Sequence, residues 1–223
     1  MIHRKQFKKE QTDNSYWKSY SDMMAGLLLM FILIMTIALA TVSEQAERLR
    51  EHEEKYTKII EKIDKELKQE FPDIKTENGV MKFEQEEIVF EEGESVLLDQ
   101  SKRFLSDFFP RYLAIVLKEE NRPYIESIII EGHTNTNGTY MENLKLSQDR
   151  ALAVANYCIN DNSSVVASSE LTELRKLITA NGRSFSELIY TEDGKEDKYK
   201  SRRVEIKVKL SEEKRKDDYN KIK

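Results

Sequence analysis

Hydrophobic and polar residues divide the chain into one long apolar run and a much more polar remainder. Met23–Val42 is a stretch of twenty residues without a charge, and its only polar side chains are Thr36 and Thr41. At ~1.5 Å per residue, a helix of this length spans roughly the hydrocarbon layer of a bilayer. The pattern therefore predicts a single transmembrane helix at residues 21–42.

This apolar run fits a permanent anchor better than a cleaved signal peptide. It is longer than the apolar core of a signal peptide, which has about 7 to 15 residues, and 22 residues precede it. Ala38 and Ala40 do offer a small-residue cleavage pattern, so cleavage stays open as the alternative. Tyr16, Trp17 and Tyr20 stand just before the run, as in the aromatic belt at a membrane interface.

Positive charge does not orient the predicted span. Five lysines and arginines precede it, and five follow it within twenty residues. The positive-inside rule therefore gives no answer, and the orientation must come from what the C-terminal domain does.

Residues 43–79 are predicted to form a helical linker, with no glycine or proline before Pro72. Alternating steps of three and four pick out an apolar seam of nearly four heptads, which is a coiled-coil pattern. The seam residues are Val42, Ala46, Leu49, Glu53, Tyr56, Ile60, Ile63 and Leu67. A parallel dimer would bury this seam. Because Glu53 interrupts it, a single amphipathic helix lying on its own domain is the alternative.

Strand-like and helix-like segments alternate over residues 80–210, which predicts an α/β domain. Strands are expected at 80–83, 87–90, 125–131 and 204–210, and helices at 99–117, 146–159 and 169–179. The continuous β-branched run at 125–131 suits a central strand. Pro110 should kink or divide the first of these helices. Residues 211–223 form a charged tail that we expect to be frayed.

Composition narrows the classes of function. Charged residues make up 35% of the chain and hydrophobic residues 39%, with a net charge of -5. One apolar run in such a chain excludes a multi-span channel and a collagen-like protein. Cys158 is the only cysteine, so no intrachain disulfide can form.

The most informative motif follows the expected central strand. Gly132-His133-Thr134-Asn135 leaves the C-terminal end of that strand, where open α/β sheets usually bind ligands. Gly138, Asn143, Leu146-Ser147, Arg150-Ala151 and Arg202-Arg203-Val204-Glu205 follow in order. Together with the upstream segment IVFEEGESVL (88–97), this pattern resembles the OmpA-like peptidoglycan-binding domain over about residues 80–210.

The resemblance implies a site for the zwitterionic diaminopimelate end of a peptidoglycan stem peptide. Arg150 matches the arginine of the family that grips the ligand carboxylate, through two parallel hydrogen bonds. Asn135 stands where the family usually has aspartate; its amide accepts from an ammonium without adding charge, so we expect weaker or differently tuned binding. Thr134 and Arg202 complete the predicted site. The alternatives are an exposed Arg150 at a helix start, and Arg202 and Arg203 as solubilising charges at a strand edge.

Peptidoglycan lies in the periplasm, so a domain that binds it must face that compartment. The resemblance therefore implies a single-pass inner-membrane protein. Its residues 1–20 form a cytoplasmic N-terminal tail, and its C-terminal domain is periplasmic.

Asp22 is the only acid that abuts the predicted span. An acid at this place is explained by helix capping and the helix dipole. However, the run W-x-x-Y-S-D-M-M-x-G-L-L-L around it resembles the signature of MotB-type stator subunits, in which one aspartate carries the transported ion. An ionisable residue within a membrane is a functional candidate by default.

Within that superfamily, the aromatic start of the span is most similar to the B subunits of the Zorya anti-phage defence system. The resemblance implies a homodimer inside a pentameric ring of a multi-span MotA-like A subunit, which protons or sodium ions passing Asp22 drive to rotate. A flagellar-type stator and a passive tether between inner membrane and peptidoglycan are the alternative functions.

We expect no enzymatic activity, because the sequence shows no nucleophile paired with a base and no metal-ligand cluster. His133 is interpreted as a hydrogen-bonded residue that shapes its loop. No cofactor, no metal and no direct nucleic-acid partner are expected.

Overall fold

A computed structural model describes residues 3–84, 87–91, 93–160 and 165–222 of the chain. It divides into two compact units, Met1–Glu51 and His52–Lys223. Helix α1 (His3–Glu70) supplies all of the regular structure described in the first unit and the first element of the second. The two units are described separately.

In the first unit, α1 contains the predicted span, and the apolar side chains of the span are exposed. The large apolar side chains from Met23 to Val42 are between 48% and 69% exposed. The hydroxyls of Thr36 and Thr41 donate to the carbonyls of Leu33 and Ile37, both at 2.9 Å, so their polar groups are satisfied within the helix as a bilayer requires. Among the described residues, α1 is the one helix long and apolar enough to cross a membrane.

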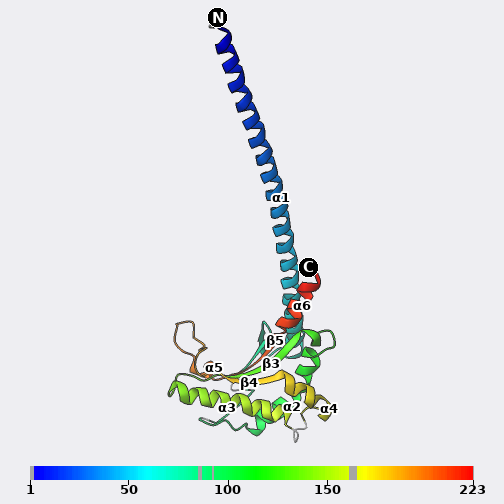
Figure 1. Cartoon of the computed structure of the whole chain (residues 1–223). Helices are drawn as coiled ribbons and strands as arrows, with labels where there is room; N and C mark the ends of the chain where they lie inside the picture. The colour runs from blue at the N-terminus through cyan, green and yellow to red at the C-terminus, as the bar shows by residue number, and fades with distance from the viewer. Residues whose placement is uncertain (1–2, 85–86, 92, 161–164, 223) are drawn as a thin grey trace. The chain divides into compact units, whose positions relative to one another are not determined.

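The second unit is an α/β domain built on one mixed sheet (Figure 1). The strands are β1 (Lys75–Glu77), β2 (Val80–Phe83), β3 (Ile125–Gly132), β4 (Ile178–Gly182) and β5 (Val204–Leu210), in the order β1-β2-β5-β3-β4. The β3–β4 pair is parallel and the other pairs are antiparallel. The helices are α2 (Asp99–Val116), α3 (Tyr140–Ile159), α4 (Ser168–Leu177), α5 (Lys198–Ser201) and α6 (Glu212–Ile222), with a 3-10 turn at Arg122–Tyr124.

Helices α2, α3 and α4 lie on the same side of the sheet (Figure 1). Strand β2 alternates, and its Met81 and Phe83 are fully buried. Phe83 meets Phe108 of α2 edge to face at 4.9 Å, and Tyr112 stacks one turn further along α2. These large side chains form the core that holds α2 against the sheet.

The last part of α1 belongs to this core, which corrects one prediction. Ile63 and Leu67 are fully buried and Tyr56 is 4% exposed, all within the same chain. Their half of the apolar seam therefore packs on its own domain, and the interpretation of residues 56–67 as a dimer seam is wrong. Val42 and Leu49, at the other end of the seam, remain exposed.

The domain is also larger than the predicted range 80–210. Strand β1 lies within the expected linker, and α6 occupies the tail that we expected to be frayed. Asp218 of α6 is paired with Lys55 of α1 at 2.9 Å and with Lys214 at 2.8 Å. The ion pair with Lys55 holds the polar helix α6 against α1, a contact that the composition of α6 does not reveal.

Several element boundaries differ from the predictions. Helix α2 continues through Pro110 without a break, because the aromatic residues on either side of the proline are buried in the core. Residues 87–90 do not form a strand: Val89 bonds Ser101 through both its N–H and its carbonyl, and Phe90 makes an isolated bridge to Leu97. Strand β4 begins at residues 178–179, which were predicted to end a helix. Its parallel pairing with β3 leaves β3 in the interior of the sheet, as predicted.

Candidate functional site

The candidate site lies where the chain leaves β3 and β4 and enters β5. The N–H of His133 donates to the carbonyl of Arg203 at 2.9 Å, and the N–H of Thr134 donates to the carbonyl of Ser184, also at 2.9 Å. These bonds extend the sheet pairing past its regular strands. The loop of residues 133–139 therefore begins on a fixed backbone, at the sheet edge where the sequence predicted a ligand site.

A capping box starts α3 six residues before the predicted helix start. The Thr139 hydroxyl accepts from the N–H of Glu142 at 3.3 Å, and the Glu142 carboxylate accepts from the N–H of Thr139 at 2.9 Å. Gly138, with φ of +90°, provides the turn before the cap. The Asn143 side chain donates to the carbonyls of Asn137 and Thr139 at 2.7 and 3.1 Å, which holds the loop against the helix.

Helix α3 approaches the ends of both parallel strands closely. A Cβ on Gly132 would lie 2.1 Å from the carbonyl oxygen of Ser147, so only glycine fits there. Ser147 accepts from the N–H of Ser184 at 2.9 Å, and Gln148 accepts from the N–H of Gly182 at 2.7 Å. The next turn of α3 is thereby fixed relative to the loop, and that turn carries Arg150.

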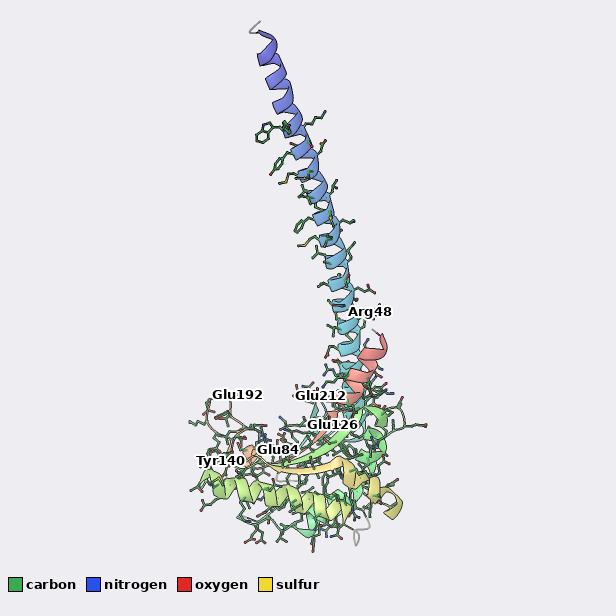
Figure 2. All side chains as sticks on the ribbon, viewed as in Figure 1. Arg48, Glu84, Glu126, Tyr140, Glu192 and Glu212 are labelled. Atoms are coloured by element: carbon green, nitrogen blue, oxygen red, sulfur yellow. The ribbon has the colours of Figure 1, made fainter. Side chains whose placement is uncertain are left out.

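All four predicted ligand residues line one cavity of about 410 Å³. The lining residues are Phe90, Gly93, Thr134, Asn135, Asn137, Gly138, Asn143, Leu146, Arg150 and Arg202. The structure thus brings Thr134, Asn135, Arg150 and Arg202 together from two loops and a helix. Figure 2 shows Tyr140, at the start of α3, and Glu192, in the loop between β4 and α5, at the same end of the domain.

Arg150 is a buried cation held by neutral groups. Its side chain donates to the backbone carbonyls of Glu94 and Glu91 at 2.9 and 3.2 Å, and its guanidinium lies 5.0 Å from the centroid of the Phe90 ring. The residue is 7% exposed, so it is not the exposed helix-start arginine of the alternative interpretation. Burial, and then repulsion from Arg202, lower the pKa of Arg150 to about 10, which leaves it charged at neutral pH.

Among the described residues, no carboxylate lies within ion-pair distance of the Arg150 guanidinium. A buried charge without a counter-ion is costly, and an anionic ligand that enters the cavity would relieve that cost. The arrangement therefore favours a carboxylate or another oxyanion that meets the remaining N–H groups of Arg150.

Thr134 and Asn135 contribute neutral polar groups to the same cavity. The Thr134 hydroxyl is buried and makes no hydrogen bond within the described residues. The Asn135 amide oxygen accepts from the N–H of Asn137 at 3.1 Å, and its amide nitrogen is 3.5 Å from the carbonyl of Lys198. Asn135 therefore shapes the loop and also faces the cavity.

Arg202 and Arg203 have different roles. Arg202 lines the cavity, in accord with its predicted place in the site. Arg203 is 7% exposed and donates to the Glu205 carboxylate at 2.6 Å and to the carbonyl of Glu187 at 3.0 Å. It therefore has a structural role, and its burial contradicts the interpretation as a solubilising charge at a strand edge.

His133 belongs to a buried charged cluster that the sequence analysis missed. Ligand atoms of Glu131, His133, Glu187 and Glu205 all lie within 4.8 Å of one another, a geometry that could hold a metal ion. However, the Lys207 ammonium lies 2.6 Å from Glu131 and 3.0 Å from Glu205, so a protein cation already neutralises these carboxylates.

The same cluster strongly perturbs one carboxyl group. Burial by itself would raise the pKa of Glu205, but neighbouring His133, Arg203 and Lys207 outweigh it and hold this pKa well below its usual range. The His133 ring nitrogen Nε2 lies 3.6 Å from Glu205, longer than a hydrogen bond, so the hydrogen bond by which His133 shapes its loop is that of its backbone N–H to the carbonyl of Arg203. Glu131 and Glu205 stand opposite each other in strands β3 and β5, a register that the sequence alone does not give.

Asp22 lies in the first unit, on α1, with an exposed side chain. Trp17 and Tyr20, five and two residues before it, meet edge to face at 6.5 Å. No described residue of the first unit covers the aspartate.

Comparisons with known proteins agree with these features. Residues 89–203 match the OmpA family. The chain is 31% identical to the Zorya protein ZorB of Escherichia coli (strain Crooks) over 220 residues, covering 92% of each chain. It is 27% identical to the Zorya protein ZorB of Escherichia coli O139:H28 over 217 residues, covering 92% of this chain and 85% of that one.

Among solved structures, the periplasmic domain of Helicobacter pylori MotB is similar, with 13% identity and a TM-score of 0.45 over 67% of this chain and 88% of that one. The cell wall anchor of the type VI secretion system of Pseudomonas aeruginosa gives 23% identity and a TM-score of 0.41, over 65% of this chain and 92% of that one.

Proposed function

Because the chain belongs to the OmpA family and to the family of the Zorya protein ZorB, we propose that it is the peptidoglycan-anchored B subunit of an ion-driven motor in anti-phage defence. The C-terminal domain binds the wall and the transmembrane helix carries Asp22. A partner A subunit with several spans forms a ring that rotates around a dimer of this chain, driven by protons or sodium ions.

One observation carries the wall-binding part of the proposal. Arg150 is a buried cation without a carboxylate partner among the described residues, in a cavity that also contains Thr134, Asn135 and Arg202. Such a cavity suits the carboxylate of a stem peptide, because a guanidinium holds a carboxylate through paired, charge-assisted hydrogen bonds.

Wall binding then sets the orientation. Peptidoglycan is periplasmic, so the domain His52–Lys223 faces the periplasm and the N-terminus faces the cytoplasm. The apolar side chains of Met23–Val42 are exposed in the single chain and need lipid or partner helices around them. Exposed Val42 and Leu49 support a dimer contact that continues from the span, ending before the buried part of the seam.

The ion-carrying part depends on Asp22. Each elementary charge that crosses a membrane at 100 mV releases about 2.3 kcal/mol, so several ions per cycle would drive rotation. One acid on one span is insufficient for a conducting path, so the A subunit must supply the other polar groups of that path.

The test of wall binding is co-sedimentation of the full chain, in detergent, with purified sacculi. Arg150→Ala should reduce the bound fraction at least about tenfold, because truncating a buried arginine at a binding centre costs 2 kcal/mol or more. Lys145→Ala is the matched control, since Lys145 is an exposed cation on α3 that pairs with Asp149. Equal retention of Arg150→Ala and wild type would reject the site.

The test of ion coupling is phage plating on cells that carry the complete system. Asp22→Asn should abolish protection while the protein stays in the membrane and still binds sacculi. Full protection by Asp22→Asn would leave a passive tether as the better function. A change in swimming without a change in plating would favour a flagellar-type stator.

A further inference from the structure

The charged cluster around His133 lies on the face of the sheet that points away from α3. Gly132 lies against α3, so its neighbours Glu131 and His133 project from the opposite face, because side chains alternate along a strand. Glu205 stands opposite Glu131 in β5 and projects with it. Glu187 reaches the same place from the loop between β4 and α5. Two strands and a loop therefore bring these side chains together.

The ammonium of Lys207 marks a position for a cation within this cluster. It lies 2.6 Å from Oε2 of Glu131, 3.0 Å from Oε2 of Glu205 and 4.0 Å from Oε2 of Glu187. Three carboxylate oxygens thus converge on one positively charged atom. The fold has built a cation position here, and in this structure a lysine of the chain fills it.

His133 is the member of the cluster that an ammonium alone does not explain. Its side chain is fully buried, yet neither ring nitrogen makes a hydrogen bond within the described residues. Nε2 points at the same carboxylates, 3.6 Å from Glu205 and 3.9 Å from Glu131. A buried polar atom without a partner is costly, and a metal ion bound to the neutral imidazole would remove that cost.

The charge of the cluster fits a divalent ion. The three carboxylates supply three negative charges, and the buried Arg203 neutralises one of them through Glu205. The two negative charges that remain equal the charge of a divalent metal ion. Lys207 and Arg183 pair with them in this structure. Their side chains are 23% and 44% exposed, so both can turn into solvent when a metal ion binds.

We propose that Glu131, His133, Glu187 and Glu205 bind a Zn²⁺ ion, which displaces the ammonium of Lys207. The four ligand atoms lie within 4.8 Å of one another. In a tetrahedral Zn²⁺ site they would be about 3.4 Å apart, so the glutamate side chains need to move by only about 1 Å. Imidazole and carboxylate are both ligands of Zn²⁺. Because the protein fills all four positions, the ion is structural, and its binding does not depend on the proposed wall binding.

The first test is the thermal unfolding of the full chain, in detergent and without a histidine tag. Isothermal titration calorimetry gives the Kd for Zn²⁺. At a concentration of Zn²⁺ a hundredfold above this Kd, the Tm should be about 5 to 10 °C higher than in EDTA, because the ion stabilises the folded state. Mg²⁺ at the same concentration should not raise the Tm, since it prefers six oxygen ligands and dehydrates reluctantly. An equal Tm in EDTA and in Zn²⁺ would overturn the proposal.

Lys207→Met tests the displacement of the ammonium. In EDTA this variant should have a lower Tm than wild type, because buried carboxylates lose their counter-ion. Zn²⁺ should restore the Tm and bind about tenfold more tightly than to wild type, since no ammonium competes with it. Lys209→Met is the matched control: Lys209 is two residues further along β5 and pairs with Glu126 at 2.6 Å. It should leave the Zn²⁺ affinity unchanged. If Zn²⁺ does not restore Lys207→Met, the lysine is only a structural counter-ion and the proposal is wrong.

His133→Gln and Glu187→Gln locate the ion. Each should weaken Zn²⁺ binding at least about tenfold, because even residues that only orient a metal ligand contribute that much. Glu187 is half-buried in a loop, so Glu187→Gln keeps the test decisive if His133→Gln does not fold. The chain has two other histidines. Zn²⁺ that binds Glu187→Gln as tightly as wild type would be held elsewhere, and this site would be rejected.

Discussion

Replacing Gly132 by alanine tests whether the close approach of α3 to β3 builds the site. The added Cβ would lie 2.1 Å from the Ser147 carbonyl oxygen and 3.0 Å from its carbonyl carbon. Favourable contacts between heavy atoms lie near 3.5 Å, so α3 must move by roughly 1 Å or more. Gly132 is not among the glycines with positive φ, so the cost is steric rather than conformational.

The expected loss combines overpacking with disturbed anchoring. Overpacking a tight contact costs about 1 to 3 kcal/mol. The displaced helix would also strain the hydrogen bonds that Ser147 and Gln148 make to the chain at the end of β4, each worth about 1 kcal/mol. We therefore expect Gly132→Ala to reduce the free energy of unfolding by about 3 to 5 kcal/mol.

The assay is urea denaturation of the full chain in detergent, followed by circular dichroism. Gly194→Ala is the matched control, because Gly194 has φ of +77° and nothing within 4 Å of the added carbon. It should lose only about 1 kcal/mol, from left-handed backbone strain. If the two variants lose equal stability, the account of how α3 is positioned is refuted.

Three further predictions follow from buried or paired groups. Glu205→Gln should reduce the free energy of unfolding by about 3 kcal/mol, because it leaves buried Arg203 without its carboxylate; a loss below about 0.5 kcal/mol would contradict this. Since the folded-state pKa of Asp218 is held at about 2 by Lys214 and Lys55, its contribution should be present above about pH 4, the pKa in the unfolded chain, and be lost as the pH falls towards 2. Asp218→Asn should flatten that part of the stability profile. Cys158 is fully buried and burial raises the pKa of its thiol, so it should react with a thiol reagent only after unfolding; rapid reaction in the native protein would contradict its placement.

The site was more predictable from sequence than the boundaries of the domain. Thr134 and Asn135 follow a strand, so local patterning places them at the sheet edge, whereas Arg150 was assigned to the site from the resemblance to OmpA-like domains. Strand β4 and helix α6 were missed because tertiary contacts decide them: β4 is set by parallel pairing with β3, and α6 by its ion pairs with α1. The same reason explains why Ile63 and Leu67 were assigned to a dimer seam, since an apolar seam fits a partner helix and a domain core equally well.

The most direct measurement of the central claim is photo-crosslinking of a diaminopimelate stem peptide, carrying a diazirine next to its carboxylate, to the full chain. Peptide mapping should place the label on residues 134–150 or on Arg202, and Arg150→Ala should abolish it. A second cavity of about 540 Å³, lined by residues of α2 and α4, offers a mainly apolar alternative within the same domain. Labelling there, or labelling that persists in Arg150→Ala, would contradict the account.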